Sequence, residues 1–410
     1  MSEISADIAV IGGGASGLAA AIAAKSVNRG LRVIIAERLP RTGKKLLSTG
    51  NGRCNLGNRE LSPENYHGTV DAMGYISRAP RAEELFRSLG VLTVCDSAGR
   101  LYPHSGSAAT VLSALRMRAE ELGAEERCGA EITGILPQKG RYALDTAAGD
   151  RILCTRVIIA AGAYADPKSG TDGRMLGILR KMGYKTAECT PAVAPLRTSP
   201  ELLKGLKGVR AKCRISAAAG GKTLRTETGE LQFTEQMLSG ICVFDLAYLW
   251  GKYGTGLTVS ADLVPELERD ELERYLEQVC AMHSRQPVSE LLTGLFRREL
   301  AAYIIKRAAD KPLSAEIRSL KRQELSAAAR YCKDLRFPVT GAAGWQNAQS
   351  TFGGVVQSEV GDDLQSKRHR GLYLCGEILD TVGDCGGYNL QWAWTSGTIA
   401  GREAAVFKKK

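Results

Sequence analysis

The chain has 410 residues, 44% hydrophobic and 24% charged, which is typical of a folded protein with two or three domains. No apolar run reaches the length of about 20 residues that a membrane helix needs, and the first residues lack a secretory signal pattern, so we expect a cytoplasmic protein. The eleven cysteines form no C-x-x-C pair, which indicates free thiols in a reducing compartment and no metal site.

The net charge of +11 raises the question of a nucleic-acid partner. The basic residues are interleaved with acidic ones, however, and aromatic residues make up only 6% of the chain. The longest basic run, residues 408–410, is expected to be a solvated tail. We therefore expect a small-molecule substrate and no nucleic acid as the main partner, because anionic cofactors and substrates account for the excess equally well.

The first 37 residues predict a strand, a tight turn, a helix and a second strand. An apolar run leads into Gly12, Gly14 and Gly17, and an alanine-rich segment follows. In this G-x-G-x-x-G pattern, glycines permit the turn, the approach of a pyrophosphate and close helix–strand packing. Glu37 closes the second strand about 20 residues later, where an acidic side chain accepts hydrogen bonds from ribose hydroxyls. The pattern predicts a dinucleotide site.

Residues 38–58 form a glycine-rich, basic segment directly after this acid. Lys44, Lys45 and Arg53 can lie near phosphates, and the bend at residues 50–52 can carry the backbone past a flat ring. The alternative is a solubilising loop.

The next part of the chain continues the α/β pattern. We expect helices over 79–89, 108–123 and 172–182, a loop over 99–104, and strands over 128–136, 142–146 and 152–161, the last ending at the small-residue turn of Gly162.

The pattern of apolar, glycine and proline residues changes near Pro191, which predicts an inserted domain over 192–338. Short alternating segments make residues 192–264 β-rich, and amphipathic patterns make 265–338 helical. The flanking parts, 1–191 and 339–410, then belong to one cofactor-binding domain.

The C-terminal part carries a second glycine-rich element. A strand over 371–375 ends in Gly376 and Glu377, and Gly386 and Gly387 precede a small-residue helix. Backbone N–H groups at such a helix start can face an electron-rich ring edge. The alternative is a glycine turn that caps an ordinary helix.

Two longer motifs make the pattern specific: Gly43-Lys44-Lys45 leading to Ser48-x-Gly50-x-Gly52-Arg53-Cys54-Asn55, and Gly376-Glu377-x-Leu379-Asp380 leading to Cys385-Gly386-Gly387-Tyr388-Asn389-x-Gln391-Trp392-Ala393. With weaker matches at 99–103 and 233–240, the chain resembles the BaiN-like bacterial flavoproteins, NAD(P)/FAD-dependent oxidoreductases. The resemblance implies an α/β fold with a two-dinucleotide-binding-type, Rossmann-like FAD domain and an inserted β-barrel-like plus helical domain. His104 and Ile241 depart from the family pattern.

Motif and resemblance together predict a non-covalent FAD site. Its residues are Gly12, Gly14, Ala15, Ser16, Gly17, Glu37, Arg38, Lys44, Lys45, Asn51, Gly52, Arg53, Cys54, Ile132, Gly162, Gly376, Glu377, Gly386, Gly387, Tyr388, Asn389 and Leu390.

The chain has neither a second glycine fingerprint nor a short-spaced redox cysteine pair. We therefore expect NAD(P)H to dock transiently over the flavin, in the cleft between the FAD domain and the insert. Tyr388, His104 and Cys54 are the candidates for a catalytic acid, with Tyr102 beside them. A packing tyrosine, a hydrogen-bonded loop histidine and a packing thiol are the alternatives.

Three functions remain open. The first is NAD(P)H-driven reduction of a small unsaturated carbonyl or steroid-like substrate, which the resemblance favours because the family includes a reductase of dehydrogenated bile acids. The second is a flavin-dependent amine oxidase that uses oxygen, and the third is an RNA-binding flavoprotein. The sequence does not define the oligomeric state.

Overall fold

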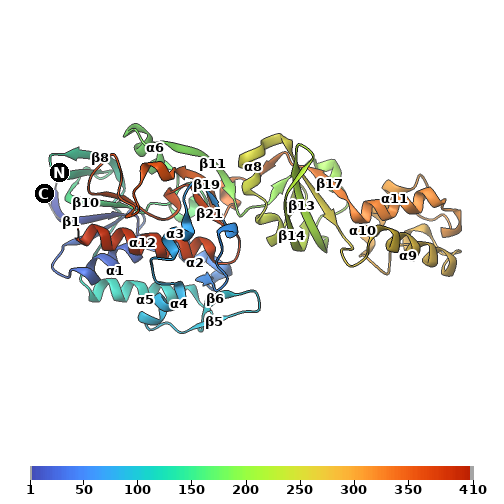
Figure 1. Ribbon diagram of the computed structural model, residues 1–410, viewed down its shortest axis with the longest axis horizontal. Coiled ribbons are helices and arrows are strands. Elements are labelled where there is room, and N and C mark those ends of the chain that lie inside the picture. Colours follow the sequence, from blue (N-terminus) through green and yellow to red (C-terminus); the bar gives the residue numbers. More distant parts are fainter. Residues whose placement is uncertain (1, 407–410) are drawn as a thin grey trace. The chain divides into compact units, whose positions relative to one another are not determined.

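The computed structural model describes residues 2–406, so the basic run at 408–410 lies outside the described residues. The chain forms two compact units, one of Met1–Thr190 with Ala348–Lys410 and one of Pro191–Asn347 (Figure 1). The second boundary lies at Asn347 rather than at residue 338, because the strand β18 (Gly341–Ala342) pairs with β12 (Leu196–Arg197) inside the insert.

The first unit is built on a parallel sheet with the strand order β7-β2-β1-β10-β20. These strands are β1 (Glu3–Ile11), β2 (Val33–Glu37), β7 (Glu125–Cys128), β10 (Arg151–Ile159) and β20 (Leu372–Leu374). The predicted order of strand, helix and strand at the N-terminus is present, because the apolar run of β1 is buried on both faces as parallel sheets require.

An antiparallel extension completes this sheet. β8 (Ile132–Gln138) and β9 (Arg141–Thr146) form a hairpin, and β9 pairs with the first half of β10, while β20 pairs with its second half. The strand predicted over 128–136 is wrong as one element, because the chain turns at Gly129, which has a φ of 74°. Cys128, the first residue of the predicted strand, is the last residue of the parallel β7, and the predicted residues from Ile132 onward belong to β8.

The helix that follows the glycine loop packs closely against the C-terminal helix of the chain. In α12 (Tyr388–Val406), a Cβ on Gly397 would lie 2.3 Å from the carbonyl oxygen of Ser16, and one on Gly401 would lie 2.1 Å from that of Ala20. α12 therefore packs backbone to backbone on α1 (Ala15–Val27), as Figure 1 shows. The small residues of the C-terminal helix are needed for this contact.

The remaining elements of the first unit lie around this core. They are α2 (Lys44–Ser48), β3 (Gly57–Asn58), β4 (Tyr66–Gly68), α3 (Ala72–Ile76), α4 (Ala82–Ser88), β5 (Thr93–Cys95), β6 (Arg100–Pro103), α5 (Ala108–Glu121), α6 (Arg174–Lys181), β11 (Thr186–Ala192), β19 (Ser350–Val355) and β21 (Thr381–Gly383). The loop predicted over 99–104 contains the strand β6, which pairs with β3 and β5.

The second unit contains a seven-stranded sheet with the order β17-β16-β13-β14-β15-β12-β18. Its further strands are β13 (Arg210–Ala219), β14 (Lys222–Phe233), β15 (Met237–Ser239), β16 (Leu257–Asp262) and β17 (Leu335–Pro338). The terminal strands β17 and β18 are separated by two residues: the Val339 N–H bonds to Leu257 at one end and the Thr340 N–H to Arg197 at the other. The sheet thus curls into the expected barrel-like form.

The helical part of this unit is an excursion between β16 and β17. It consists of α9 (Arg269–Met282), α10 (Arg298–Ala308) and α11 (Arg322–Lys333), while the short α7 (Ile241–Phe244) and α8 (Tyr248–Tyr253) precede β16. The region predicted as helical up to residue 338 ends at Lys333, because β17 returns to the barrel. Within residues 2–406, no helix has the length and apolar content to span a bilayer.

Candidate cofactor site

The three glycines of the turn between β1 and α1 have two different roles: Gly12 and Gly17 allow close packing, and Gly14 leaves open space. A Cβ on Gly12, whose φ is 101°, would lie 2.6 Å from the Ala160 carbonyl oxygen, and one on Gly17 would lie 1.9 Å from that of Gly12. Both glycines are therefore needed for packing. A Cβ on Gly14 would meet nothing within 4 Å, so the backbone there faces open space at the N-terminus of α1. Gly162, with a φ of 67°, turns the chain after β10.

Glu37 is buried at the end of β2 and holds two loops. Its Oε2 accepts a hydrogen bond from the Gly13 N–H and its Oε1 one from the Leu39 N–H, both 2.8 Å long. The Glu37 carbonyl accepts the Ala130 N–H at 2.9 Å, which draws the segment before β8 to the same place. Ile132, buried at the start of β8, follows. Each carboxylate oxygen keeps a lone pair for a further donor.

Arg38 ties the next loops to this corner. Its guanidinium lies 2.7 Å from Asp172 and 3.5 Å from Glu131, and it donates to the Gly170 carbonyl at 3.3 Å. The hydrogen bond to Asp172 raises the pKa of Arg38. Burial works against ionisation of Asp172, but the hydrogen bonds from Arg38 and the Arg174 N–H, together with the charges of both arginines, outweigh it and lower the pKa of Asp172. Arg38 is thus held by acids of the protein.

Lys45 and Glu377 join the basic segment to the C-terminal part of the unit. The Nζ of Lys45 in α2 lies 2.6 Å from the Oε2 of Glu377. The Oε1 of Glu377 accepts the Thr351 hydroxyl at 2.8 Å, and that hydroxyl oxygen accepts the N–H groups of Tyr164 and Ala165 at 3.2 Å. Two predicted residues far apart in sequence therefore meet, and Thr351, which the sequence did not single out, fixes one of them.

The bend that follows α2 has an unusual backbone. Gly50, Asn51 and Gly52 have φ values of 58°, 55° and 80°, so three successive residues are left-handed. Arg53 is exposed, and its guanidinium lies over the ring of Tyr102 at 4.8 Å from the centroid. Lys44 is also exposed.

Cys54 lies at the end of this bend with its side chain fully buried. Burial raises the pKa of its thiol to about 12, against a smaller effect of the hydrogen bond with Thr49. The thiol is therefore protonated at neutral pH, which argues against a reactive thiolate and for packing.

The C-terminal glycines lie against the N-terminal motif. A Cβ on Gly376, with a φ of 76°, would lie 2.5 Å from the hydroxyl oxygen of Ser16. A Cβ on Gly387 would lie 2.3 Å from the Gly57 carbonyl oxygen and 2.6 Å from the Oδ1 of Asn55. That Oδ1 is buried and has no hydrogen-bond partner among residues 2–406. A buried acceptor without a donor beside a helix start suits a ligand that donates a hydrogen bond.

The first turn of α12 holds the other predicted residues. The side-chain oxygen of Asn389 accepts a hydrogen bond of 2.9 Å from the Gly383 N–H, and its side-chain nitrogen donates one of 2.7 Å to the Gly383 carbonyl oxygen. Tyr388 is buried, its ring meets that of Tyr66 edge-on at 5.9 Å, and its carbonyl accepts the Tyr66 hydroxyl at 3.2 Å. Leu390 packs on the core.

Sequence patterns missed a hydrogen-bonded histidine and aspartate beside these glycines. His67 in β4 and Asp384, just before Gly386, lie 2.8 Å apart, and the side-chain amide of Asn65 donates to the other oxygen of Asp384 at 3.3 Å. Because 317 residues separate His67 from Asp384, no local pattern signals this pair. His104, by contrast, is exposed in a turn, and its backbone N–H bonds to Leu92.

These observations fit FAD, which presents a pyrophosphate, ribose hydroxyls and a flat ring with hydrogen-bonding edges. The open backbone at Gly14 suits the pyrophosphate, the buried carboxylate of Glu37 suits hydroxyl donors, and the unpaired oxygen of Asn55 suits an N–H of the ring. Residues 2–406 contain no cluster of three or more metal-ligating side chains.

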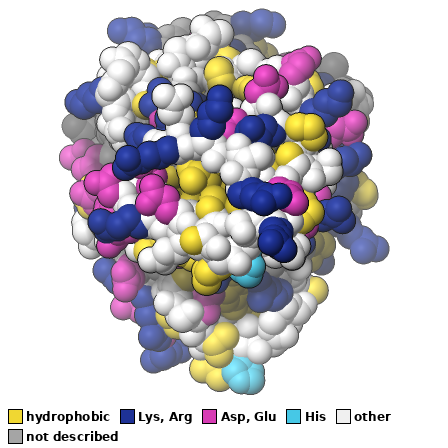
Figure 2. All heavy atoms as spheres, turned by 90° about the vertical axis from the view of Figure 1, so that its right-hand side faces the viewer, with side chains coloured by type: hydrophobic (Ala, Val, Ile, Leu, Met, Phe, Trp, Pro, Cys, Tyr) yellow, Lys and Arg dark blue, Asp and Glu magenta, His cyan; other side chains and the backbone are white. Residues whose placement is uncertain are grey.

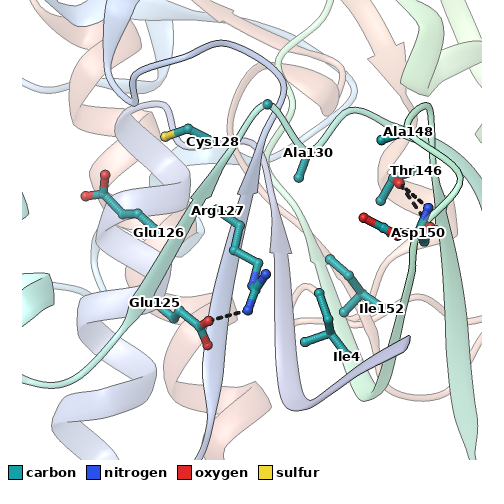
Figure 3. Close-up of a pocket in the computed structure, with 11 residues that line it drawn as sticks. Ile4, Glu125, Glu126, Arg127, Cys128, Ala130, Thr146, Ala148, Asp150 and Ile152 are labelled. Carbon is teal, nitrogen blue, oxygen red and sulfur yellow. Dashed lines mark hydrogen bonds and ion pairs between the residues drawn. The ribbon is translucent and has the colours of Figure 1, made fainter. Parts of the chain in front are cut away.

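A pocket of about 390 Å³ lies elsewhere in the first unit (Figure 3). Ile4, Arg127, Asp150 and Ile152 are among its lining residues, and Arg127 forms an ion pair of 2.7 Å with Glu125. None of the predicted FAD residues lines it.

The fold and these contacts are those of an FAD-binding Rossmann protein, and the comparison with known families agrees. The family model of the HI0933-like protein Rossmann domain matches residues 6–403, and the chain belongs to this family. It is a flavin-dependent oxidoreductase, as the resemblance predicted.

Its relatives include two curated enzymes that match along their whole length. The 3-dehydro-bile acid delta(4,6)-reductase of Clostridium scindens is 35% identical over 97% of this chain and 98% of the relative. The ribosomal RNA dihydrouridine synthase of Escherichia coli is 26% identical over 98% of both chains. Among solved structures, the 3-ketosteroid delta1-dehydrogenase of Sterolibacterium denitrificans shares the fold, with a TM-score of 0.53, 12% identity and coverage of 98% of this chain and 99% of that one.

Proposed function

We propose that the protein uses FAD and NAD(P)H to reduce a carbon–carbon double bond conjugated to a carbonyl group in a small, steroid-like substrate. The observation that carries this proposal is the full-length similarity to the bile acid delta(4,6)-reductase, at 35% identity. Bound FAD would supply the hydride chemistry, with the nicotinamide as the source of the hydride and the electron-poor carbon of the alkene as its acceptor.

The residues proposed to hold FAD are those predicted from the sequence, together with Asn55. The N–H groups at the start of α1 bind the pyrophosphate beside Gly14, and Glu37 accepts the ribose hydroxyls. Lys45 adds positive charge, and Glu377 and Thr351 fix its position, supported by the 2.6 Å ion pair and the 2.8 Å hydrogen bond.

Reduction of the alkene also needs a proton at the carbon next to the carbonyl group. Of the three predicted acids, Tyr388 is supported best, because it lies at the start of α12 next to the glycines and is 9% exposed, whereas His104 lies in an exposed turn and the Cys54 side chain is 0% exposed. Tyr388→Phe should therefore slow substrate reduction but leave flavin reduction by NAD(P)H unchanged. Tyr373→Phe is the matched control, because this buried hydroxyl bonds to the carbonyl of Glu403 at the other end of α12.

A second candidate is reduction of a uracil base in RNA, which the similarity to the dihydrouridine synthase favours. The same chemistry serves it, since the C5–C6 double bond of uracil is conjugated to a carbonyl. On the face in Figure 2, Lys and Arg side chains are scattered among Asp, Glu and apolar side chains rather than gathered in one patch. This face therefore lacks the continuous basic patch that is typical of an RNA-binding surface. Amine oxidation by oxygen remains the third candidate.

One experiment separates these candidates. The purified holoprotein is incubated with NADH or NADPH and, in turn, a 3-oxo-4,6-diene steroid, a uridine-containing ribosomal RNA fragment, or a primary amine with oxygen. The proposal expects a gain of 2 Da per reduced bond in the steroid. A gain only in the RNA would establish the second candidate. Peroxide release that requires the amine and occurs without NADH or NADPH would establish the third. Either result without steroid reduction contradicts the proposal.

A further inference from the structure

Two cysteines of the second unit, far apart in sequence, lie side by side. Cys213 is in β13 and Cys242 is in the first turn of α7, and both lie beside Gly229 of β14. Both side chains are buried, at 1% and 2% exposed. No short-spaced cysteine motif signals this pair, because the fold and not the local sequence brings the two residues together.

The backbone holds this pair in place. Cys213 lies opposite Gly229 in the register of β13 and β14, and a Cβ on Gly229 would lie 3.1 Å from the Cβ and 3.5 Å from the sulfur of Cys242. Cys242 thus occupies the space that a side chain at Gly229 would take, next to Cys213. The turn into α7 rests on the same strand, since a Cβ on Gly240 would lie 2.2 Å from the carbonyl oxygen of Glu230.

The two thiols are not equivalent. The interaction with the Cys242 thiol raises the pKa of Cys213, and the interaction with the Cys213 thiol lowers the pKa of Cys242. Negative charge is therefore better tolerated on Cys242, which makes it the nucleophile of the pair. Cys332, buried in the same unit, differs, because burial raises the pKa of its thiol to about 12.

We propose that Cys213 and Cys242 are a redox modification site that closes to an intramolecular disulfide when the protein meets a peroxide. The sulfur of Cys242 attacks one oxygen of hydrogen peroxide, the O–O bond breaks, and sulfenic acid and water form. Cys213 then attacks this sulfur, an S–S bond forms, and a second water leaves. Two thiols lose two electrons and two protons, and one peroxide becomes two waters. The oxidant is of a kind that reduced flavins produce from oxygen, yet the proposal does not depend on the flavin reaction.

The test uses the full-length protein with its own cysteines. Reduced protein is treated with hydrogen peroxide, quenched with catalase, denatured, alkylated and analysed by mass spectrometry. We expect a crosslink between the peptides of Cys213 and Cys242, a loss of 2 Da, and recovery of both thiols with dithiothreitol. Oxidation of Cys128, whose side chain is exposed, shows that the dose was sufficient.

Single variants identify the roles. Cys213→Ser should give no crosslink and instead a sulfenic acid on Cys242 that dimedone traps, while the matched control Cys332→Ser should crosslink as the wild type does. The proposal is overturned if Cys213 and Cys242 stay fully alkylated while Cys128 is oxidised, or if Cys242 of the wild type ends as a sulfinic acid without a crosslink. The wild-type result decides on its own if a variant does not fold.

Discussion

Replacing Gly14 by alanine should weaken FAD binding while leaving the apoprotein folded. The backbone at Gly14 has a φ of −81° and a ψ of −166°, which any residue adopts, and a Cβ there meets no protein atom within 4 Å. The protein therefore loses only the N-cap preference for glycine over alanine, below about 1 kcal/mol. The added methyl group instead occupies the space proposed for the pyrophosphate. Overpacking by one such group costs about 1–3 kcal/mol, which corresponds to a factor of about 5–150 in Kd.

The assay compares FAD affinity, measured by quenching of flavin fluorescence on titration of apoprotein, with the denaturant midpoint of that apoprotein. Gly177→Ala is the matched control, because Gly177 in α6 also faces open space and alanine there should raise stability by about 1 kcal/mol without touching FAD. Equal FAD affinity of Gly14→Ala and wild type would refute the placement of the pyrophosphate, and so would equal weakening in Gly177→Ala.

Three further predictions concern packing and charge. Gly401→Leu should lower the free energy of unfolding by about 1–3 kcal/mol or more, and with it the denaturant midpoint, since a Cβ would already lie 2.1 Å from the Ala20 carbonyl oxygen. An unchanged midpoint contradicts the helix contact. Arg368 bonds to buried Glu359 and lowers the pKa of that carboxyl, so this pair stabilises the fold above the ordinary carboxylate pKa and stops doing so as the pH falls through the lowered value. Arg368→Gln should then be less stable than wild type at pH 7, and the difference should shrink as the pH falls below the ordinary carboxylate pKa, as urea titrations over a series of pH values would show. Cys54→Ala should keep its flavin and the rate of flavin reduction in stopped-flow measurements, because its thiol is buried; loss of reduction would restore a catalytic role.

The N-terminal half of the site was predictable because its signals are local. The apolar run of β1, the three glycines and Glu37 each lie within one element or turn, so spacing alone implies their roles. The strand β7 was missed as a parallel strand, because Glu125–Cys128 is a polar edge segment without an apolar run.

The contacts that complete the site depend on pairs distant in the chain. Lys45 and Glu377 are 332 residues apart, and only the resemblance to a family suggested that both serve one cofactor. Likewise, the curl of the barrel depends on β17 pairing with β16 at one end of the sheet and on β18 pairing with β12 at the other. Neither β17 nor β18 carries a sequence pattern that predicts its partner strand.

The most direct measurement of the central claim is an anaerobic titration of the holoprotein with NADH and NADPH, followed by flavin absorbance. The account predicts that one of the two bleaches the flavin and that a 3-oxo-4,6-diene steroid, added without oxygen, restores the oxidised spectrum. A flavin that stays oxidised with both nucleotides, or that is bleached but not reoxidised by the steroid, would contradict it.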